Sequence, residues 1–364
     1  MTPRGASVLL TMLIVASCGG NGRAAPLSNS STTPASPLAT PLIDVYGMMG
    51  AFPPATFFVI GGQDATIKAV ALLNHAIKYR ISFAGKDPQV VASPPGGLSS
   101  GRVYVLDQVT EGARIRWFDT DSGNERASQV IAGATVNGTG VGHGALAVDG
   151  STGIVYALLR KADGIAVDGF DWFTLKPART VFGQLRCGER LAAASNRIAV
   201  ACMSEGALVI DDSGKSTKLL AKHSFVAMAM LGDGTLVAGG ADGSLVRLAR
   251  QATELEVVNT LKDYGKGLIP DGIAVNAGCC LYYGILDPQA KDVQMRSVAG
   301  GLMLIAFPAS TPPTGGFFVQ APFAYYVIDG KARHIDINQG FQEVMADLGE
   351  GVGAGAAPGA VADR

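Results

Sequence analysis

The sequence predicts an all-β fold made of repeated units, and three observations carry this prediction. The chain of 364 residues is 48% hydrophobic and only 16% charged, so it can bury a large core. Its 48 glycines and 18 prolines are scattered between short apolar runs, which favours strands and tight turns over long helices. Finally, one strand–turn–strand pattern recurs along the chain at nearly constant spacing.

The repeat is clearest in His223–Ala249, HSFVAMAMLGDGTLVAGGADGSLVRLA. Two apolar runs there are separated by Gly-Asp-Gly-Thr, whose residues suit the positive φ angles of a tight turn. The second run has counterparts that begin at Phe57, Val103, Val155, Ile198, Leu236, Leu281 and Ala324. These starts are about 45 residues apart on average, and one four-stranded propeller blade occupies roughly 40 to 50 residues.

We therefore predict a β-propeller over residues 42–350, with seven blades of four antiparallel strands and six blades as the alternative. Closing the ring requires a joint between the first and last blades, and residues near Leu42–Met49 are one candidate for it. Residues 351–364 are rich in Gly and Ala without periodicity, so we expect a disordered tail.

Small side chains fill the strand that precedes each repeated apolar run. The innermost strands of a propeller crowd around the central channel, so small residues there let the blades approach one another. This pattern favours a closed ring over an open sandwich. The residues concerned are Ala145, Ala147, Ala192, Ala193, Ala194, Ala227, Ala229 and Ala274.

The N-terminal segment has the features of an export signal. Residues 1–17 contain Arg4 and an apolar run from Val8 to Ala16 that is too short to span a bilayer, and they end in small residues before Cys18. This arrangement resembles the lipobox of bacterial lipoproteins, which implies that Cys18 carries a lipid anchor. An ordinary secretory signal is the alternative. Residues 18–41 are rich in Ser, Thr and Pro and predict a flexible tether.

These features predict an extracytoplasmic protein held to the bacterial cell membrane by its lipid. The chain has 29 basic and 30 acidic residues, and no basic run is interleaved with aromatic residues. Nucleic acid is therefore excluded as an expected partner, because its binders carry a basic patch. We expect the partners to be the membrane, through the anchor, and a protein or glycan of the cell envelope.

Two segments resemble repeats of known bacterial propellers. Gly144–Leu158 (GALAVDGSTGIVYAL) and Asp271–Gly284 (DGIAVNAGCCLYYG) are similar to repeats of the YVTN, NHL and quinoprotein-like families. Together with the lipobox, the chain resembles propeller lipoproteins of the actinobacterial type. The second segment is also similar to one blade of the sugar-lactone hydrolases, but the metal ligands of those enzymes cannot be placed here. The resemblance implies a fold and does not choose a function.

A candidate site lies at the predicted channel mouth, where loops leading into the innermost strands converge. His143, Glu189, Arg190, His223 and Asp271 fall at comparable positions just before these strands. Imidazoles and carboxylates on one rim suit metal binding or acid–base chemistry. The alternative is that each is an ordinary polar loop residue.

Four cysteines remain besides Cys18, and an exported protein can form disulfides. Cys187 and Cys202 bracket a predicted hairpin at Ser195–Asn196 and are nearly equidistant from its turn, which makes them a candidate pair. Cys279 and Cys280 are adjacent. They form either a strained vicinal disulfide or two separate thiols.

Two functional hypotheses follow from the sequence. The first is a non-enzymatic envelope lipoprotein whose propeller binds a protein, glycan or small ligand, with no cofactor. The alternative is a propeller enzyme (lactone hydrolase, lyase or quinone-dependent oxidoreductase) that uses the channel mouth, and only this alternative calls for a divalent metal or a quinone.

Overall fold

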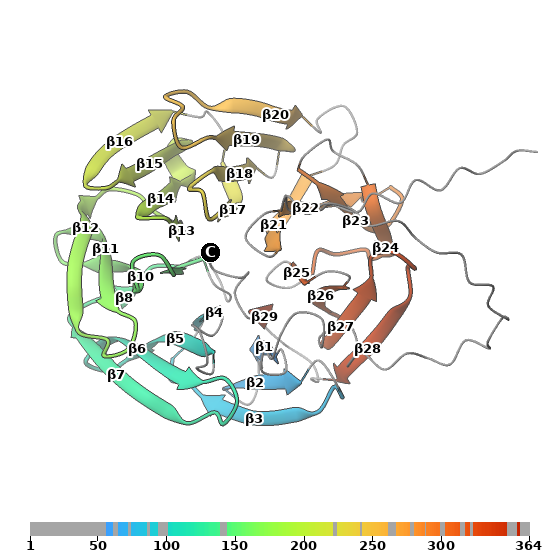
Figure 1. Ribbon diagram of the computed structural model, residues 1–364, viewed down its shortest axis with the longest axis horizontal. Helices are drawn as coiled ribbons and strands as arrows, with labels where there is room; N and C mark the ends of the chain where they lie inside the picture. The colour runs from blue at the N-terminus through green and yellow to red at the C-terminus, as the bar shows by residue number, and fades with distance from the viewer. Residues whose placement is uncertain are drawn as a thin grey trace, which may run out of the picture. The chain divides into compact units, whose positions relative to one another are not determined.

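Seven small antiparallel sheets stand around a common axis in the computed structural model of the protein (Figure 1). The prediction of an all-β propeller with seven blades is confirmed, and the six-blade alternative is wrong. The described residues are 56–60, 65–71, 74–85, 88–93, 101–138, 144–220, 224–240, 242–260, 267–276, 280–287, 289–298, 303–313, 317–320, 323–347 and 355–356.

The blades are numbered in sequence order, and their strands are given from the channel outward. Blade 1 contains β29 (Gly355–Ala356), β1 (Thr56–Ile60), β2 (Thr66–Ala71) and β3 (Ile77–Ser82). Blade 2 contains β4 (Gln89–Ser93), β5 (Arg102–Val109), β6 (Gly112–Asp119) and β7 (Glu125–Ala132). Blade 3 contains β8 (Thr135–Val136) and β9 (Leu146–Asp149), which both pair with β10 (Ile154–Lys161), followed by β11 (Gly164–Asp171) and β12 (Pro177–Leu185).

The remaining four blades each have four strands in simple sequence order. Blade 4 contains β13 (Arg190–Ala194), β14 (Arg197–Cys202), β15 (Ala207–Asp212) and β16 (Lys215–Leu220). Blade 5 contains β17 (Phe225–Met230), β18 (Leu236–Gly240), β19 (Ser244–Leu248) and β20 (Glu256–Thr260). Blade 6 contains β21 (Gly267–Asn276), β22 (Cys280–Asp287), β23 (Asp292–Ser297) and β24 (Met303–Pro308). Blade 7 contains β25 (Phe317–Gln320), β26 (Phe323–Ile328), β27 (Lys331–Asp336) and β28 (Gln342–Asp347).

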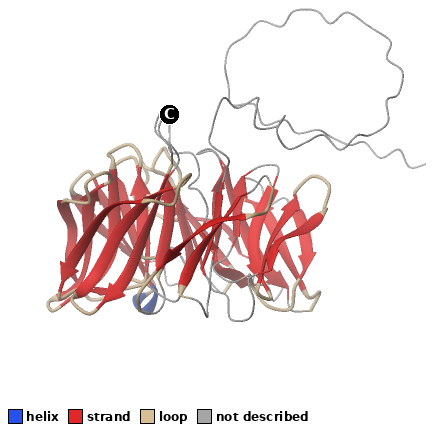
Figure 2. Ribbon diagram, turned by 90° about the horizontal axis from the view of Figure 1, so that it is seen from below, coloured by secondary structure: helices blue, strands red, loops and turns tan. Residues whose placement is uncertain are grey.

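Each of the seven repeated apolar runs lies in the second strand of its blade, as the spacing predicts. These second strands are buried on both faces because neighbouring blades cover them, so β10 and β14 show almost continuous burial. The outermost strands β7 and β16 are instead largely exposed. Seen from the side, the one-turn 3₁₀ helix η1 (Met203–Glu205) lies on one face of the ring (Figure 2).

The core of the protein lies between the blades. The largest cluster of buried apolar side chains extends from blade 2 to blade 4 and includes Tyr104, Tyr156 and Val200, none of which is exposed. Full burial of one large apolar side chain contributes roughly 1.5–3 kcal/mol. The blades therefore stabilise one another through side-chain packing, while backbone hydrogen bonds hold each blade together.

The ring closes through the C-terminal part of the described chain. Strand β29 pairs with β1, with Ala356 opposite Phe58 and Gly355 opposite Val59. The expectation that residues 351–364 are disordered is therefore wrong for these two, since they complete blade 1. Gly and Ala suit this position because the innermost strand is crowded and pairing needs only backbone groups. Leu42–Met49, the other candidate for closing the ring, lies outside the described residues.

Aspartates end several strands and organise the turns that follow. Asp119, Asp171 and Asp336 are the last residues of β6, β11 and β27. Each carboxylate accepts hydrogen bonds from the backbone N–H groups two and three residues further along the chain. Such turns satisfy backbone donors that leave the strand ladder, so they fix the hairpins between third and fourth strands.

Candidate functional site

The structure places three of the five predicted rim residues. Glu189 directly precedes β13, and Arg190 is the first residue of that innermost strand. Asp271 lies within β21 rather than in a loop before it, in an irregular stretch between the pairs Leu268–Ile285 and Ile273–Tyr283. His143 and His223 lie outside the described residues, so the proposed gathering of all five side chains stays a prediction.

Glu189 and Arg190 make contacts that join parts of the fold. Glu189 Oε2 accepts a hydrogen bond of 2.8 Å from the backbone N–H of Met203 in η1. Arg190 is only 6% exposed. Its guanidinium packs so closely on Gly144 that a Cβ added there would be 2.3 Å from Nη1. The contact of Glu189 lies within blade 4, and the contact of Arg190 joins blade 4 to blade 3.

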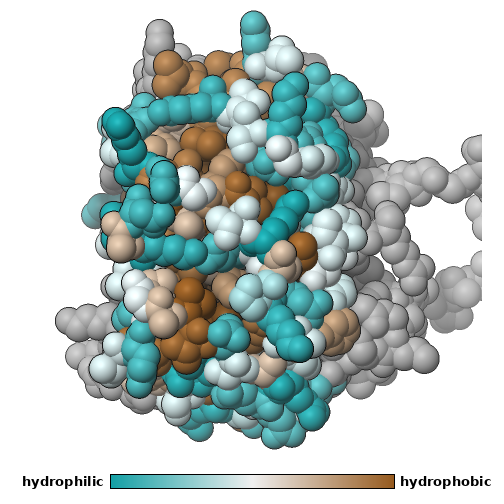
Figure 3. All heavy atoms as spheres, turned by 90° about the vertical axis from the view of Figure 1, so that its left-hand side faces the viewer, coloured by the Kyte–Doolittle hydropathy of each residue, from teal (hydrophilic) through white to brown (hydrophobic). Residues whose placement is uncertain are grey.

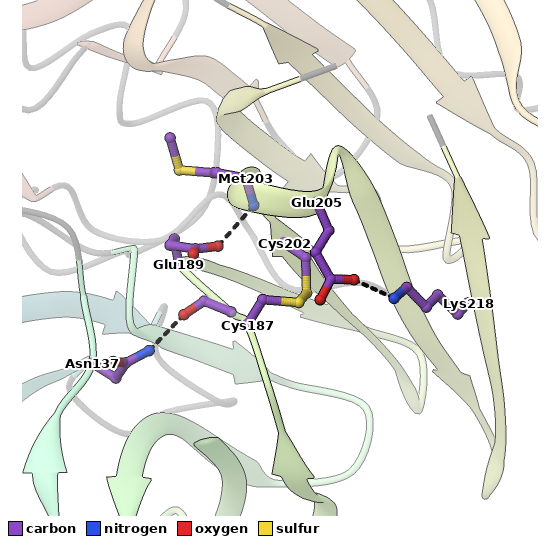
Figure 4. The surroundings of a disulfide bond; sticks show 8 residues. Asn137, Cys187, Glu189, Cys202, Met203, Glu205 and Lys218 are labelled. Carbon is purple, nitrogen blue, oxygen red and sulfur yellow. Dashed lines mark hydrogen bonds and ion pairs between the residues drawn. A yellow bond between two sulfur atoms is a disulfide. The ribbon is translucent and has the colours of Figure 1, made fainter. Parts of the chain in front are cut away.

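Cys187 and Cys202 are joined by a disulfide, with their Cα atoms 5.1 Å apart (Figure 4). The hairpin between them turns at Ser195 and Asn196, which both have positive φ angles, at 52° and 58°. The preceding strand β13 pairs with β14 in regular register, so the chain just before β13 returns to the end of β14. Asn137 Nδ2 also donates a hydrogen bond to the carbonyl oxygen of Gly188. The disulfide therefore closes the strand pair nearest the channel in blade 4.

The other two cysteines of interest are described only in part. Cys279 lies outside the described residues. Cys280 is the first residue of β22, and only its backbone is described. The choice between a vicinal disulfide and two thiols stays open.

Two hollows lie between the outer strands of adjacent blades. One of about 350 Å³ lies beside the disulfide and is lined by residues of β12, β15 and β16, by Cys187, and by the ion pair of Glu205 in η1 with Lys218. The other, of about 450 Å³, lies between β7 and β12. Lys161 and Asp168 form an ion pair of 2.7 Å in its lining. On this side of the ring, hydrophobic residues are visible between hydrophilic ones (Figure 3).

A cluster of His75, His334 and Glu343 joins blade 1 to blade 7, and none of its residues is among the candidates predicted from the sequence. His75 lies in the turn between β2 and β3, while His334 and Glu343 face each other across β27 and β28. His334 Nε2 is 3.0 Å from Glu343 Oε2, and His75 Nδ1 is 3.5 Å from Glu343 Oε1. The two imidazole rings meet edge to face, with centroids 5.0 Å apart.

The environments of these three side chains differ. His334 is buried, His75 is half-buried, and the side chain of Glu343 is 46% exposed. Burial lowers the pKa of His334 below its ordinary value, while the hydrogen bond to Glu343 acts in the opposite direction. The dominant desolvation favours a neutral imidazole in His334. No sequence motif signals this cluster, because its members come from opposite ends of the propeller sequence.

Comparisons with known proteins show the fold alone. A scan against protein-family models finds no match, and a search of curated proteins finds none either. The structure is similar to that of apo AztD from Citrobacter koseri, with a TM-score of 0.55 and 8% identity over 84% of this chain and 98% of that one. It is also similar to a chain of a mitotic checkpoint complex, with a TM-score of 0.52 and 13% identity over 90% and 89% of the two chains. At these identities a shared propeller carries no activity from one protein to another.

Proposed function

We propose that this protein is a lipid-anchored, extracytoplasmic propeller that binds a small polar ligand or the end of a glycan without catalysing a reaction. The observation that carries the proposal is the hollow of about 450 Å³ between β7 and β12. Its size is within the range of small-molecule sites. Lys161, Asp168 and Thr180 give it polar groups, and Phe170 and Pro177 give it apolar walls.

The compartment is supported by two independent features. Cys18 follows a short apolar run and small residues, as a lipid-modified cysteine does. The disulfide between Cys187 and Cys202 is a bond that persists in oxidising compartments and is rare in the cytosol. Among the residues that the structure describes, no helix has the length and apolar character needed to cross a bilayer.

The enzyme alternative finds less support in the described residues. It requires the rim side chains to converge on a substrate, whereas Glu189 contacts η1 within its own blade and Arg190 packs on Gly144 of blade 3. A binding role requires only a preformed hollow on a rigid scaffold, which the space between blades 2 and 3 provides.

Filling the hollow tests the binding role. Ala178 lies in its lining on the exposed part of β12, so Ala178→Trp would occupy the space without removing a hydrogen bond or ion pair. The measurement is binding to an array of glycans from the cell envelope. We expect the unaltered protein to bind at least one of these glycans and Ala178→Trp to lose that binding. Ala252→Trp, at an exposed position in blade 5, is the matched control. Equal retention of both variants and the unaltered chain would place the binding site elsewhere.

The anchor has a separate test. We expect Cys18→Ser to move the protein from the membrane fraction to the soluble fraction and to abolish labelling with a radioactive fatty acid. Cys280→Ser is the control and should stay membrane-bound and labelled. Persistent labelling of Cys18→Ser would contradict lipidation at this residue.

A further inference from the structure

Three side chains that can bind a metal ion meet at the joint between the first and last blades. The proposed binding function does not involve them. Two imidazoles and one carboxylate meet there, with one ligand atom of each within 4.8 Å of the others. His75 comes from blade 1, and His334 and Glu343 come from the two outer strands of blade 7. Strands β2 and β3 lie next to β27 and β28 in the ring (Figure 1).

The distances agree with a tetrahedral zinc site. Zinc binds imidazole nitrogen and carboxylate oxygen at about 2.0–2.2 Å, so two ligand atoms of a tetrahedral site lie roughly 3.3 Å apart. The two carboxylate oxygens of Glu343 each face one imidazole at a comparable distance, Oε2 at 3.0 Å from His334 Nε2 and Oε1 at 3.5 Å from His75 Nδ1. We propose that His75, His334 and Glu343 bind one divalent transition-metal ion across the joint between blades 1 and 7, and that Zn²⁺ is the preferred ion.

A β-bulge sets the positions of the two ligands on blade 7. Register shifts by one residue between Ala332 and Arg333, so that His334 pairs with Glu343. Continued in the register of the pair Ala332–Ala346, the strands would bring His334 opposite Val344 instead. Bulges commonly re-aim side chains at functional sites. This one brings a carboxylate to the imidazole.

The backbone also presents His75 in a special conformation. Its φ angle is 59°, in the left-handed region that few non-glycine residues adopt. The backbone N–H of His75 donates to the carbonyl oxygen of Ala71 at 2.9 Å, and the N–H of Ala71 donates to the carbonyl oxygen of Ala76 at 2.8 Å. The turn thus holds His75 in a conformation that costs energy, as is common for residues that serve a site.

Packing orients the second imidazole. The ring of His334 stacks on Phe323, with centroids 5.1 Å apart and planes 14° apart. Its side chain is only 6% exposed, so it has little freedom to turn away from Glu343. His334 is therefore held in place before any ion arrives.

One buried atom in the cluster has an unmet need for a partner. His75 Nε2 is buried, and no described residue forms a hydrogen bond with it. A buried ring nitrogen without a partner is costly, so native structures usually satisfy it through the protein, water or an ion. This nitrogen is not the Nδ1 atom that faces Glu343, so an ordered water rather than the ion would be its partner.

The donor set selects the class of ion. Two nitrogen ligands and one carboxylate suit Zn²⁺, while Mg²⁺ and Ca²⁺ prefer oxygen ligands. Cu²⁺ and Ni²⁺ use imidazole as well and would compete. Three protein ligands leave a fourth position, and the exposed Glu343 places it near solvent, where water would complete the coordination.

The test is a zinc titration of the purified full-length chain after treatment with a chelator. We expect one Zn²⁺ per chain by equilibrium dialysis with metal analysis. Glu343→Gln keeps the shape of the side chain, and His75→Asn keeps a residue that tolerates positive φ. Each variant should weaken binding by roughly tenfold or more, because changes even in groups that only support a ligand cost that much.

Matched controls separate this site from other zinc sites on the chain. Glu256→Gln alters an exposed outer-strand glutamate of blade 5, and His143→Asn and His223→Asn alter the other two histidines of the sequence. These three variants should bind zinc like the unaltered chain. A loss of binding in His143→Asn or His223→Asn instead would move the metal to the channel mouth and overturn the proposal.

A spectroscopic readout distinguishes ligation from a structural effect. Co²⁺ added to the chelator-treated chain should give visible absorption bands typical of four or five ligands, and Glu343→Gln should lose them while keeping its circular dichroism spectrum. Absence of zinc binding by the unaltered chain, or equal binding by all variants, would refute the site. Neither result bears on the hollow between β7 and β12, which Ala178→Trp tests separately.

Discussion

His334 lies directly across the β27–β28 pair from Glu343, with its Nε2 atom 3.0 Å from Glu343 Oε2. His75 approaches the same carboxylate from blade 1. Glu343 therefore contacts both sides of the joint between the first and last blades. An ion held by all three side chains would connect these blades independently of the pairing between β1 and β29.

Zinc should consequently raise the stability of the folded chain. A ligand that binds only the folded state stabilises it by about 2.7 kcal/mol at a concentration 100 times its Kd. We expect Tm, followed by circular dichroism, to rise with added Zn²⁺ and to fall when a chelator removes it. Glu343→Gln should show no zinc-dependent rise. A zinc-dependent rise of equal size in this variant would contradict the expectation.

Substitution of Asp107, which lies between blades 1 and 2, should strongly destabilise the fold. It is fully buried, accepts hydrogen bonds from Arg114, and accepts another from the backbone N–H of Ala84 at 2.8 Å. Arg116, also buried, lies 3.4 Å away. Removing one partner of a buried ionic group typically costs about 3–5 kcal/mol. We expect a loss of that size for Asp107→Ala in urea unfolding.

The control for Asp107 is an ion pair on the surface. Glu256 and Arg247 are both well exposed, and such pairs contribute about 0–1 kcal/mol. Glu256→Gln should therefore leave the unfolding midpoint nearly unchanged. If both variants lost a similar free energy of unfolding, burial would not explain the stability contribution of Asp107.

The disulfide of blade 4 should contribute mainly by restricting the unfolded chain. Cys187 and Cys202 are 15 residues apart, and a loop of this length predicts a contribution of about 3 kcal/mol. The double variant Cys187→Ser plus Cys202→Ser should unfold at lower urea concentration by a corresponding amount. A reductant should shift the unaltered chain to the same midpoint and leave the variant unchanged. If the unaltered chain and the double variant unfolded at the same urea concentration without reductant, the disulfide would not be stabilising.

Asp171 should show a pH-dependent contribution of known sign. Hydrogen bonds from the backbone N–H and hydroxyl of Thr174 lower the pKa of its carboxyl below the ordinary value. Folding therefore favours the charged form, and the contribution is present above about pH 4 and lost as pH falls through the lowered pKa. An NMR titration should find this low pKa, and Thr174→Val should raise it. An unchanged pKa in the variant would rule out the hydroxyl as a cause.

The architecture was predictable because every blade repeats the same physical problem. Each second strand is covered on both faces and must be apolar, so Val103, Ile198 and Leu236 all begin runs that the structure places there. Each innermost strand is crowded, which explains Ala192 and Ala227. Packing constraints of this kind recur along the sequence and can be read from it.

The cluster at the joint could not be predicted in this way. His75 and His334 lie near opposite ends of the propeller sequence, and only closure of the ring brings them together in space. The bulge that pairs His334 with Glu343 cannot be recognised from the alternation of polar and apolar residues in the sequence. Strand β29 was missed for a related reason, since its pairing uses backbone groups alone.

The pairing of β29 with β1 also constrains the order in which the protein matures. During synthesis β1 is made before the other six blades, while the strand that covers its inner edge is made after them. Until then the growing chain carries an open sheet edge, which is a known route to aggregation. Blade 1 is therefore among the first to be synthesised and the last to be finished, and a chain released early would keep that edge uncovered.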